Sequence, residues 1–371
     1  MKKIFSLFFL LLLLNTDALS QNLVTSPEVK QLTAGTNHSM ALLIDGTIWA
    51  WGKNSSGQLG DSSTKDRYMP VKIGTDSAWS SITAGNKFCH AVKKDGTLWG
   101  WGTNKVGQLG ISTTNLMYDY TTPVQIGTAS DWLMVSSGIS FTVGLKKDGT
   151  LWCWGNKLYN LQDVESNPYK PVKLTGNDNK NWAAIAAGDD FFIAQKKDGT
   201  LWTRGVLNDL LHNYGGKNVF YKVSDDTDWV NFDAGKQHVV AIKKDGSLWS
   251  WGKNEVGQLG SGSNSNAKNP LRIGREKDWQ TVTAAGNYTI ALKKNGSVWY
   301  LGQTFFMKDK AQYSANPKPF DATVKYKCIA AASERLLLSL AKEKMQGVVE
   351  CYELGYGQEK TIKLFIKTSG K

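Results

Sequence analysis

Four histidines, at positions 38, 90, 212 and 238, are the side chains best suited to acid–base catalysis near neutral pH. His38 and His238 each stand three residues after a glycine. At the matching position in other copies of the same pattern the chain carries Phe88, Phe141, Phe191 and Tyr288. A position that exchanges His for Phe selects a flat ring and not a proton carrier. We therefore interpret these histidines as structural.

Other residue types that support catalysis or metal binding also lack the required spacing. No His cluster has metal-ligand spacing, and the cysteines stand alone in the sequence. Five aspartates precede glycine once per repeat, which turn chemistry explains better than paired catalytic carboxylates: Asp45, Asp95, Asp148, Asp198 and Asp245. We predict no catalytic residues, no metal and no cofactor, and place an enzyme built from loop residues behind two binding hypotheses.

The cysteines number only four, too few to staple a chain of this size. Cys89 and Cys153 stand far apart, whereas Cys328 and Cys351 fall on strands that we expect to be neighbours near the C-terminus. Neighbouring strands would allow one disulfide there. The sequence leaves both the bridged and the reduced form open.

A repeat of about 50 residues organises the chain. The segment Lys93–Gly110, KKDGTLWGWGTNKVGQLG, returns almost unchanged as Lys243–Gly260, KKDGSLWSWGKNEVGQLG. The glycine of each Asp-Gly or Asn-Gly pair marks the copies, with a degenerate seventh marker at Gly347: Gly46, Gly96, Gly149, Gly199, Gly246 and Gly296. A period of this length indicates one structural unit repeated along the chain.

All 15 tryptophans fall in three columns of this repeat. The first column stands three residues after the marker: Trp49, Trp99, Trp152, Trp202, Trp249 and Trp299. The second stands five after it, with Arg204 and Leu301 as departures: Trp51, Trp101, Trp154 and Trp251. The third precedes an Ala-Gly-type step: Trp79, Trp132, Trp182, Trp229 and Trp279. Indoles two residues apart on a strand share one face, so we expect packing between repeats.

Each repeat predicts four short strands joined by glycine-rich turns. Examples are Ser81–Gly85, Phe88–Lys94, the Trp-x-Trp-Gly segment after the Asp-Gly turn, and Pro70–Ile73. A worn last copy spans Lys325–Lys367, with Tyr326 in place of the third-column tryptophan. We predict an all-β fold, a seven-bladed β-propeller of four-stranded antiparallel blades over residues 21–371.

The full pattern resembles the regulator of chromosome condensation repeat. Ala-Gly-x-x-His-x-x-Ala followed by Asp-Gly-x-x-Trp-x-Trp-Gly-x-Asn-x-x-Gly-Gln-Leu-Gly is legible in Ala34–Gly60, and nearly so in Ala84–Gly110 and Ala234–Gly260. The fourth and sixth copies depart most, because both lack Gly-Gln-Leu-Gly. A propeller with Trp-Asp repeats, or one with a Gly-Gly pair in every blade, fits less well.

The resemblance implies a fold more firmly than an activity. Its founding member is a nuclear exchange factor for a small GTPase, a partner we consider unlikely here because of the N-terminal segment described next. Plant ultraviolet photoreceptors of this fold carry tryptophans just after the Ala-Gly step, where this chain has Thr36, Asn86, Ile139, Asp189 and Lys236. A secreted bacterial β-lactamase inhibitor of this fold lays one propeller face on its target. That precedent implies a secreted, bacterial-type propeller with a protein-binding face.

The N-terminal segment Met1–Ser20, MKKIFSLFFLLLLLNTDALS, has two lysines, a short apolar run and a polar end. This pattern is typical of a secretory signal peptide, and the run is too short to span a bilayer as a helix. We therefore predict a signal peptide over residues 1–20 and a secreted, periplasmic or cell-surface protein.

Two surfaces are candidates for binding. Lysine pairs precede the hairpin turns, as in Lys93-Lys94 and Lys243-Lys244, within a chain of net charge +12. They predict a basic ring that could bind acidic polysaccharide or another anionic polymer, although solvated turns explain them too.

The second surface is made by the connections between third and fourth strands, which differ between repeats. Five aromatics there are the predicted contacts for an extracellular or surface protein: Tyr118, Tyr120, Tyr159, Phe305 and Phe306. Protein binding or adhesion through that surface is our first hypothesis, and polymer binding is the alternative.

Overall fold

The structure is a computed structural model that describes residues 28–112, 118–156, 169–175, 180–205, 207, 219–304, 312–320, 324–332, 335–340, 348–355 and 358–365. The signal peptide predicted over residues 1–20 lies outside the described residues. Strands dominate the described part, and each repeat contributes four of them, β1 to β28 in chain order.

The strands follow the repeat closely. The first two repeats contain β1 (Val29–Ala34), β2 (His38–Leu43), β3 (Ile48–Gly52), β4 (Arg67–Lys72), β5 (Trp79–Ala84), β6 (Phe88–Lys93), β7 (Leu98–Thr103) and β8 (Asp119–Gln125). The next two contain β9 (Trp132–Ser137), β10 (Phe141–Lys146), β11 (Leu151–Gly155), β12 (Val172–Lys173), β13 (Trp182–Ala187), β14 (Phe191–Lys196), β15 (Leu201–Gly205) and β16 (Tyr221–Lys222). The last three contain β17 (Trp229–Ala234), β18 (His238–Lys243), β19 (Leu248–Gly252), β20 (Ala267–Ile273), β21 (Trp279–Ala285), β22 (Tyr288–Lys293), β23 (Val298–Thr304), β24 (Gln312–Pro319), β25 (Tyr326–Ala332), β26 (Arg335–Leu340), β27 (Val348–Gly355) and β28 (Gln358–Phe365).

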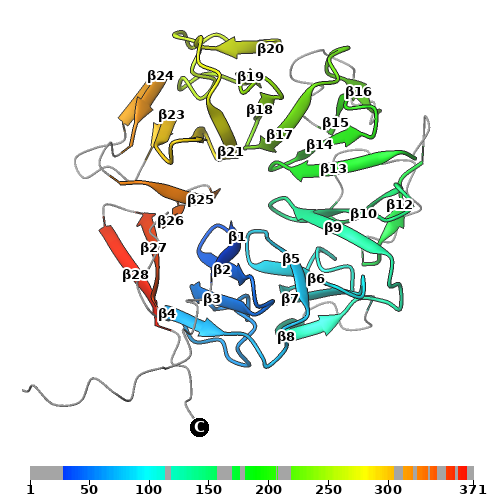
Figure 1. Cartoon of the computed structure of the whole chain (residues 1–371). Coiled ribbons are helices and arrows are strands. Elements are labelled where there is room, and N and C mark those ends of the chain that lie inside the picture. The colour runs from blue at the N-terminus through cyan, green and yellow to red at the C-terminus, as the bar shows by residue number, and fades with distance from the viewer. Residues whose placement is uncertain are drawn as a thin grey trace, which may run out of the picture.

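Hydrogen bonding joins these strands into antiparallel sheets, so a β-propeller of four-stranded blades is confirmed. Within the described residues there are seven such sheets, from β1–β4 to β25–β28, each with its strands in chain order. Figure 1 shows the sheets arranged around a central opening, with the first strand of each nearest the opening. These inner strands contact one another around the ring, as β1 does β5 and β21 does β25. The inner strands therefore form the wall of a central channel.

The ring closes by packing of the last blade against the first. Strand β1 contacts β25 and β26, and the outer strand β4 contacts β28. Val29, Leu32 and Trp51 of the first blade share one buried cluster with Ala330 and Leu337 of the last. In this ring each terminal sheet is built from one continuous segment of chain.

The hydrophobic core lies between blades, and the tryptophan columns build it. One cluster joins Trp251 of β19 to Phe191 and Leu201 of the preceding blade, and another joins Trp101 of β7 to Leu42 of β2. The second-column and third-column indoles are buried, whereas first-column indoles such as Trp249 and Trp99 are half-buried at the same interfaces. Packing of the indoles between repeats is confirmed, but Trp99 and Trp249 are only half-buried, because the first-column indole lies nearer the turn than its second-column neighbour. Tyr326 is buried in the third-column position, as predicted.

The Asp-Gly turn is held by side-chain hydrogen bonds that recur around the ring. Asp45 Oδ1 accepts hydrogen bonds from the backbone N–H and the hydroxyl of Thr47, at 2.9 and 2.7 Å. The Thr47 hydroxyl in turn accepts a hydrogen bond from Trp49 Nε1, at 3.2 Å. Gly46 has φ of +83°, and a Cβ there would lie 2.0 Å from the Ser77 carbonyl. Asp, Gly and Thr or Ser are thus required by the turn and by the chain that passes beside it.

The register separates the two C-terminal cysteines. Cys328 on β25 pairs with Ser339 on β26, which pairs on its other side with Cys351 on β27. Strands two places apart are separated by about 9–10 Å, beyond the Cα–Cα span of a disulfide. Cys328 is a free cysteine. The expectation that these cysteines lie on neighbouring strands is wrong because β26 runs between them.

Replacing Trp251 with Ala should lower the free energy of unfolding by about 3–5 kcal/mol, because its indole is 2% exposed within the core between two blades. Chemical denaturation followed by circular dichroism measures this loss. Val230→Ala is the control, since Val230 is 59% exposed and its truncation should change stability by less than about 0.5 kcal/mol. A loss below about 1 kcal/mol for Trp251→Ala would contradict the inter-blade core.

Candidate functional site

The two ends of the ring carry different kinds of connection. One end, which we call the loop end, carries the Ala-Gly turns between first and second strands and the connections between third and fourth strands. The other, the turn end, carries the Asp-Gly turns and the links from each fourth strand to the next blade. Of the predicted aromatics, the described Tyr118 and Tyr120 belong to the loop end, and the lysine pairs belong to the turn end.

The structure places only two of the five predicted aromatic contacts. Tyr118 is 58% exposed and lies just before β8. Tyr120 lies within β8, where it packs half-buried against a core cluster that includes Trp101. Its prediction as a loop residue is wrong, because the outer strand begins earlier than its proline pattern indicates. Tyr159, Phe305 and Phe306 lie outside the described residues.

The Gly-Gln-Leu-Gly segments of the loop end are part of the scaffold. Asn54 Oδ1 accepts a hydrogen bond from Leu59 N, at 2.9 Å, which folds the segment on itself. The carbonyl of Gln58 accepts hydrogen bonds from Trp101 Nε1 at 3.0 Å and from Cys89 Sγ at 3.3 Å, both on the next blade. The segment therefore ties one blade to its neighbour and leaves few groups for a ligand.

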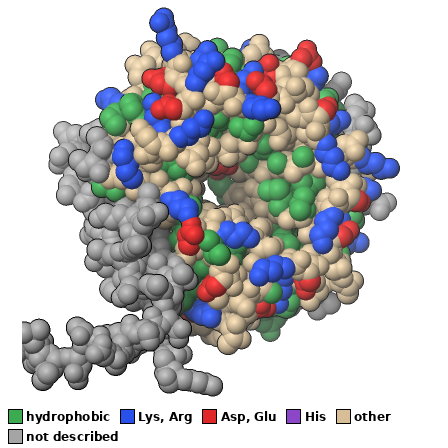
Figure 2. Space-filling view, in the orientation of Figure 1, with side chains coloured by type: hydrophobic (Ala, Val, Ile, Leu, Met, Phe, Trp, Pro, Cys, Tyr) green, Lys and Arg blue, Asp and Glu red, His purple; other side chains and the backbone are tan. Residues whose placement is uncertain are grey.

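The lysine pairs divide into one structural and one exposed lysine. In five blades the first lysine of the pair holds its Nζ over a third-column and a first-column indole, as Lys243 does at 4.8 Å from Trp229 and 4.6 Å from Trp249. Lys243 Nζ also lies 3.0 Å from Asp226 and 3.3 Å from Asp228, with its side chain 11% exposed. The second lysine, such as Lys244, is exposed. In the face shown in Figure 2, basic and acidic side chains are interspersed around the opening.

The histidines are buried between blades. His238 Nε2 lies 2.9 Å from Thr289 Oγ1, and that hydroxyl donates to the carbonyl of Gln258, at 3.2 Å. His38 Nε2 similarly lies 2.9 Å from Cys89 Sγ. Desolvation by burial lowers the pKa of His90 and of His238 to about 4. These contacts agree with the structural interpretation. His212 lies outside the described residues.

The buried cysteines lack the properties of nucleophiles. Burial raises the pKa of the Cys89 thiol well above its usual value and that of Cys153 to about 12. Thiolate is the reactive form of cysteine, and both sites disfavour it. In the described part of the chain no three His, Cys, Asp or Glu side chains gather as a metal site would require.

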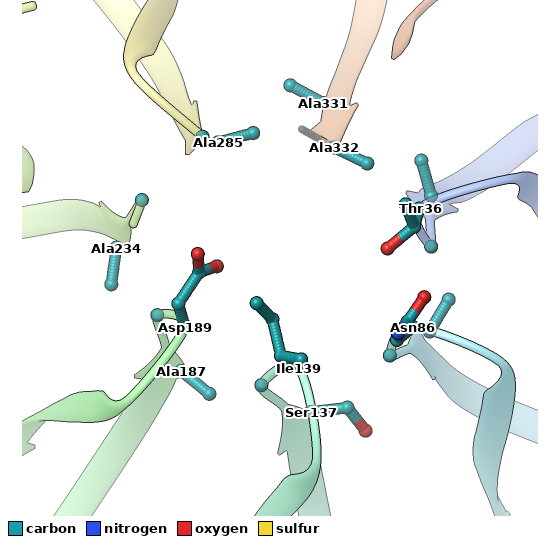
Figure 3. Close-up of a pocket in the computed structure, with 18 of the residues that line it drawn as sticks. Thr36, Asn86, Ser137, Ile139, Ala187, Asp189, Ala234, Ala285, Ala331 and Ala332 are labelled. Carbon is teal, nitrogen blue, oxygen red and sulfur yellow. The ribbon is translucent and has the colours of Figure 1, made fainter. Parts of the chain in front are cut away.

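The channel opens at the loop end into a mouth of about 80 Å³, lined by the Ala-Gly turns of the blades. The glycines of these turns fit tightly: a Cβ on Gly188 would lie 2.4 Å from the carbonyl of Gly235 in the next blade. The residue after each glycine is therefore the first one with room for a side chain. In Figure 3, Ile139 and Asp189 point from these positions toward the centre of the mouth, and Thr36 and Asn86 lie across from Asp189.

Hydrogen bonds between successive turns fix the mouth. Ile139 N donates to the Asp189 carbonyl at 3.4 Å, Asp189 N to the Gly235 carbonyl at 3.3 Å, and Lys236 N to the Gly286 carbonyl at 2.9 Å. Desolvation and, to a smaller extent, the neighbouring Asp190 raise the pKa of the Asp189 carboxyl to about 6, and Lys236 opposes the shift. Asp189 is thus a half-buried carboxyl group at the channel mouth.

A larger cavity of about 300 Å³ continues along the channel between the inner strands. Asp233 of β17 lines it, and its Oδ2 accepts hydrogen bonds from Thr283 Oγ1 and Ala284 N of β21, both at 2.9 Å. Burial raises the pKa of Asp233 to about 6. Because its carboxylate oxygens have backbone and hydroxyl partners, Asp233 joins two inner strands, whereas Asp189 faces the opening.

Sequence reasoning placed no site at this mouth. The residues after the Ala-Gly glycines were compared only with the tryptophans that photoreceptors of this fold carry at the same positions. The available signal was that this column changes from Thr to Asn, Ile, Asp and Lys while its neighbours repeat. Side chains that vary beside a fixed glycine have no shared packing role.

Together these features define the class of protein. A closed ring of antiparallel blades places its repeated aromatics between blades and leaves its two ends for interactions, as in a β-propeller scaffold. Two models of the regulator of chromosome condensation (RCC1) repeat match, one at residues 45–92, 95–145 and 245–292, the other at residues 29–58, 135–159 and 229–258. The chain belongs to the RCC1 repeat family.

Similar curated proteins match over single repeats. The ultraviolet-B receptor UVR8 of Arabidopsis thaliana is 40% identical over 45 residues, which cover 12% of this chain and 10% of the receptor. The human X-linked retinitis pigmentosa GTPase regulator is 43% identical over 54 residues, which cover 14% of this chain and 5% of the regulator. The matches thus span a tenth or less of these relatives.

Solved structures match over the whole fold. Yeast RCC1 (Prp20), solved with Kap60, is 17% identical with a TM-score of 0.73, over 93% of this chain and 86% of that one. Human WBSCR16 is 16% identical with a TM-score of 0.73, over 85% of this chain and 88% of that one. At these identities the likeness supports the fold alone. No described helix is long and apolar enough to cross a membrane.

Replacing Lys243 with Met should lower the free energy of unfolding by about 1–2 kcal/mol, because the cation is held between two indoles. Lys244→Met is the matched control on the exposed neighbour, with an expected change below about 0.5 kcal/mol. Urea denaturation of the two variants measures both values. Equal losses would show that Lys243 has no special role between the indoles.

Replacing His238 with Phe should remove part of the acid sensitivity of folding. The unfolded chain binds a proton on His238 with a pKa near 6.5, but the folded chain does so only near 4, so stability falls as pH drops through this window. Between pH 7 and pH 5 the parent should lose about 2 kcal/mol more stability than His238→Phe. Denaturation at both pH values measures this, and the carboxyl groups common to both proteins cancel. A difference that does not change with pH would contradict the buried neutral histidine.

Proposed function

We propose that this protein is a non-enzymatic interaction module that holds a partner protein against its loop end. The observation that carries the proposal is where the non-repeating residues collect. Repeated Trp, Asp, Thr and Gln residues are engaged in packing and turns, while the mouth positions and the exposed Tyr118 at the same end have no such role. Residues without a structural role on a rigid scaffold are the best candidates for recognition.

Known propellers of this fold support a protein partner. Yeast RCC1 was solved with Kap60 bound, and the structure of Prp20p from Saccharomyces cerevisiae is described with its binding to Gsp1p and histones. Those partners belong to those proteins. For this chain we carry over only the use of the propeller as a docking body for another protein.

The compartment of the partner follows from the N-terminal segment. Two lysines and the apolar run Ile4–Leu14 favour export, so the proposed partner is an extracellular, periplasmic or surface protein. We propose that such binding serves adhesion or, as for the secreted bacterial inhibitor that the repeat resembles, places one propeller face on a target protein. An intracellular small GTPase would be out of reach of an exported protein.

Binding of acidic polymer is the weaker alternative. Four of the first lysines have side chains only 11 to 16% exposed and lie 2.5 to 3.3 Å from carboxylates of Asp76, Asp131, Asp228 or Asp278. One exposed lysine per pair remains for a polyanion, beside an exposed Asp in most blades. A smaller basic surface would give a smaller salt dependence than the lysine count suggests.

Affinity capture from the native secreted and surface fraction, with the mature chain as bait, should recover a protein partner. Tyr118→Ser should weaken its binding at least about tenfold, as expected when an interface aromatic is lost. Ile44→Ser is the matched control, because Ile44 is 57% exposed at the turn end. Equal binding by Tyr118→Ser and the parent, with loss on Ile44→Ser or Lys244→Gln, would move the site to the turn end.

Expression with the native leader should yield a protein that begins near Gln21 and appears outside the cytoplasm, because residues 1–20 have the pattern of a cleaved signal. N-terminal sequencing of the fractionated protein measures this. Intact Met1 on cytoplasmic protein would contradict export and would restore intracellular partners as candidates.

A further inference from the structure

We propose that the channel mouth at the loop end binds one cationic side chain, a primary ammonium group of the lysine type, with Asp189 as its counter-charge. The inference rests on the proposed function in one respect, namely that the ammonium group belongs to the partner protein. The site itself is defined by the mouth and can be tested without that partner.

The mouth has the form of a single socket on the axis of the ring. Its cavity of about 80 Å³ is bounded by turns from successive blades and leads into the larger cavity of about 300 Å³. The Asp189 carboxylate points into this opening in Figure 3. Inter-turn hydrogen bonds join the backbones of Asp189 and Ile139 on neighbouring blades, so the turn that carries the carboxylate is held in place before any ligand arrives.

The carboxylate of Asp189 lacks a close counter-charge in the described structure. None of the ion pairs among the described residues includes Asp189. The charged groups nearest to it are Asp190 on the same turn, which repels a second negative charge, and Lys236 on the next turn, which is exposed and is not among the residues that line the mouth. A partly desolvated carboxylate without a close partner gains most from an incoming cation.

The remaining walls select the shape of that cation. Ile139, 40% exposed, places an apolar side chain at the mouth, whose exposed lining is otherwise mostly polar. Thr36 and Asn86 supply polar side chains on the opposite side in Figure 3. A lysine side chain has an apolar stem and a compact charged head, which match this combination. A guanidinium is planar and larger than an ammonium group, so a mouth of about 80 Å³ favours the compact head of lysine.

The proposal predicts that Nα-acetyl-L-lysine methylamide binds the mature protein at this mouth. Titration followed by two-dimensional NMR should shift the backbone signals of Ile139, Asp189 and Gly235 and yield a dissociation constant. Nα-acetyl-L-norleucine methylamide has the same stem without the charge and should show no saturable shift. Asp189→Asn should weaken binding of the lysine probe at least tenfold.

Asp190→Asn is the matched control, because it removes the same charge from the exposed neighbour, and it should change the dissociation constant less than twofold. Asp189→Ser provides a second variant if the Asn substitution disturbs folding, which circular dichroism and tryptophan fluorescence monitor. Unchanged binding by both folded Asp189 variants would overturn the proposal, as would equal binding of the norleucine probe. Tighter binding of Nα-acetyl-L-arginine methylamide or of Ca²⁺ would overturn the assignment to an ammonium group.

The two proposals fail in different ways. If Tyr118→Ser weakens capture of the partner while the lysine probe does not bind, the interaction module stands and the ammonium socket falls. If the probe binds and depends on Asp189 while no partner is captured at the loop end, the socket stands and the proposed function falls.

Discussion

Burial of tryptophan between blades is the interaction on which the rest of this structure depends. A single four-stranded sheet cannot cover its own aromatic face, so each blade needs its neighbour. Trp251 lies in one cluster with Phe191 and Leu201 of the preceding blade, and the same arrangement joins the first blade to the last through Trp51 and Leu337. The ring is stable because aromatic packing of this kind recurs around it, with Tyr326 in place of tryptophan between the sixth and seventh blades, and because the last blade packs against the first.

The same packing draws charged residues into the scaffold. Lys93 Nζ lies 4.1 Å from the centre of the Trp99 ring and 5.0 Å from that of Trp79, and it pairs with Asp76 at 2.5 Å. A lysine held between two indoles and a carboxylate contributes to the interface between strands and is poorly available to a polymer. The turn end is therefore less basic in effect than its sequence indicates.

Pairs of side chains that could take part in catalysis are likewise used for packing between blades. His38 and Cys89 lie within hydrogen-bonding distance, a combination that elsewhere can activate a thiol. Here both side chains are buried, and desolvation raises the pKa of the Cys89 thiol. The equivalent pair in another blade is His238 with Thr289, which shows that the position serves to link one blade to the next. Among the described residues, the loop-end residues that do not repeat have no such packing role, and the proposed function rests on them.

The sequence by itself determined the blade, because the signals for a blade are local. Alternation along a strand and glycine with positive φ in a turn act within a few residues, so even the worn last copy predicted over Lys325–Lys367 forms four strands, β25 to β28. Only the tertiary structure decided which indole of a pair is fully buried and that Asp189 faces a channel mouth. It also decided that Lys243 lies between two indoles and that β26 separates Cys328 from Cys351. The buried indole and Asp189 depend on how closely a neighbouring blade approaches from about 50 residues away, whereas Lys243 and the cysteines depend on strand order and register within one sheet. A periodic sequence specifies each unit but does not state the contacts between units.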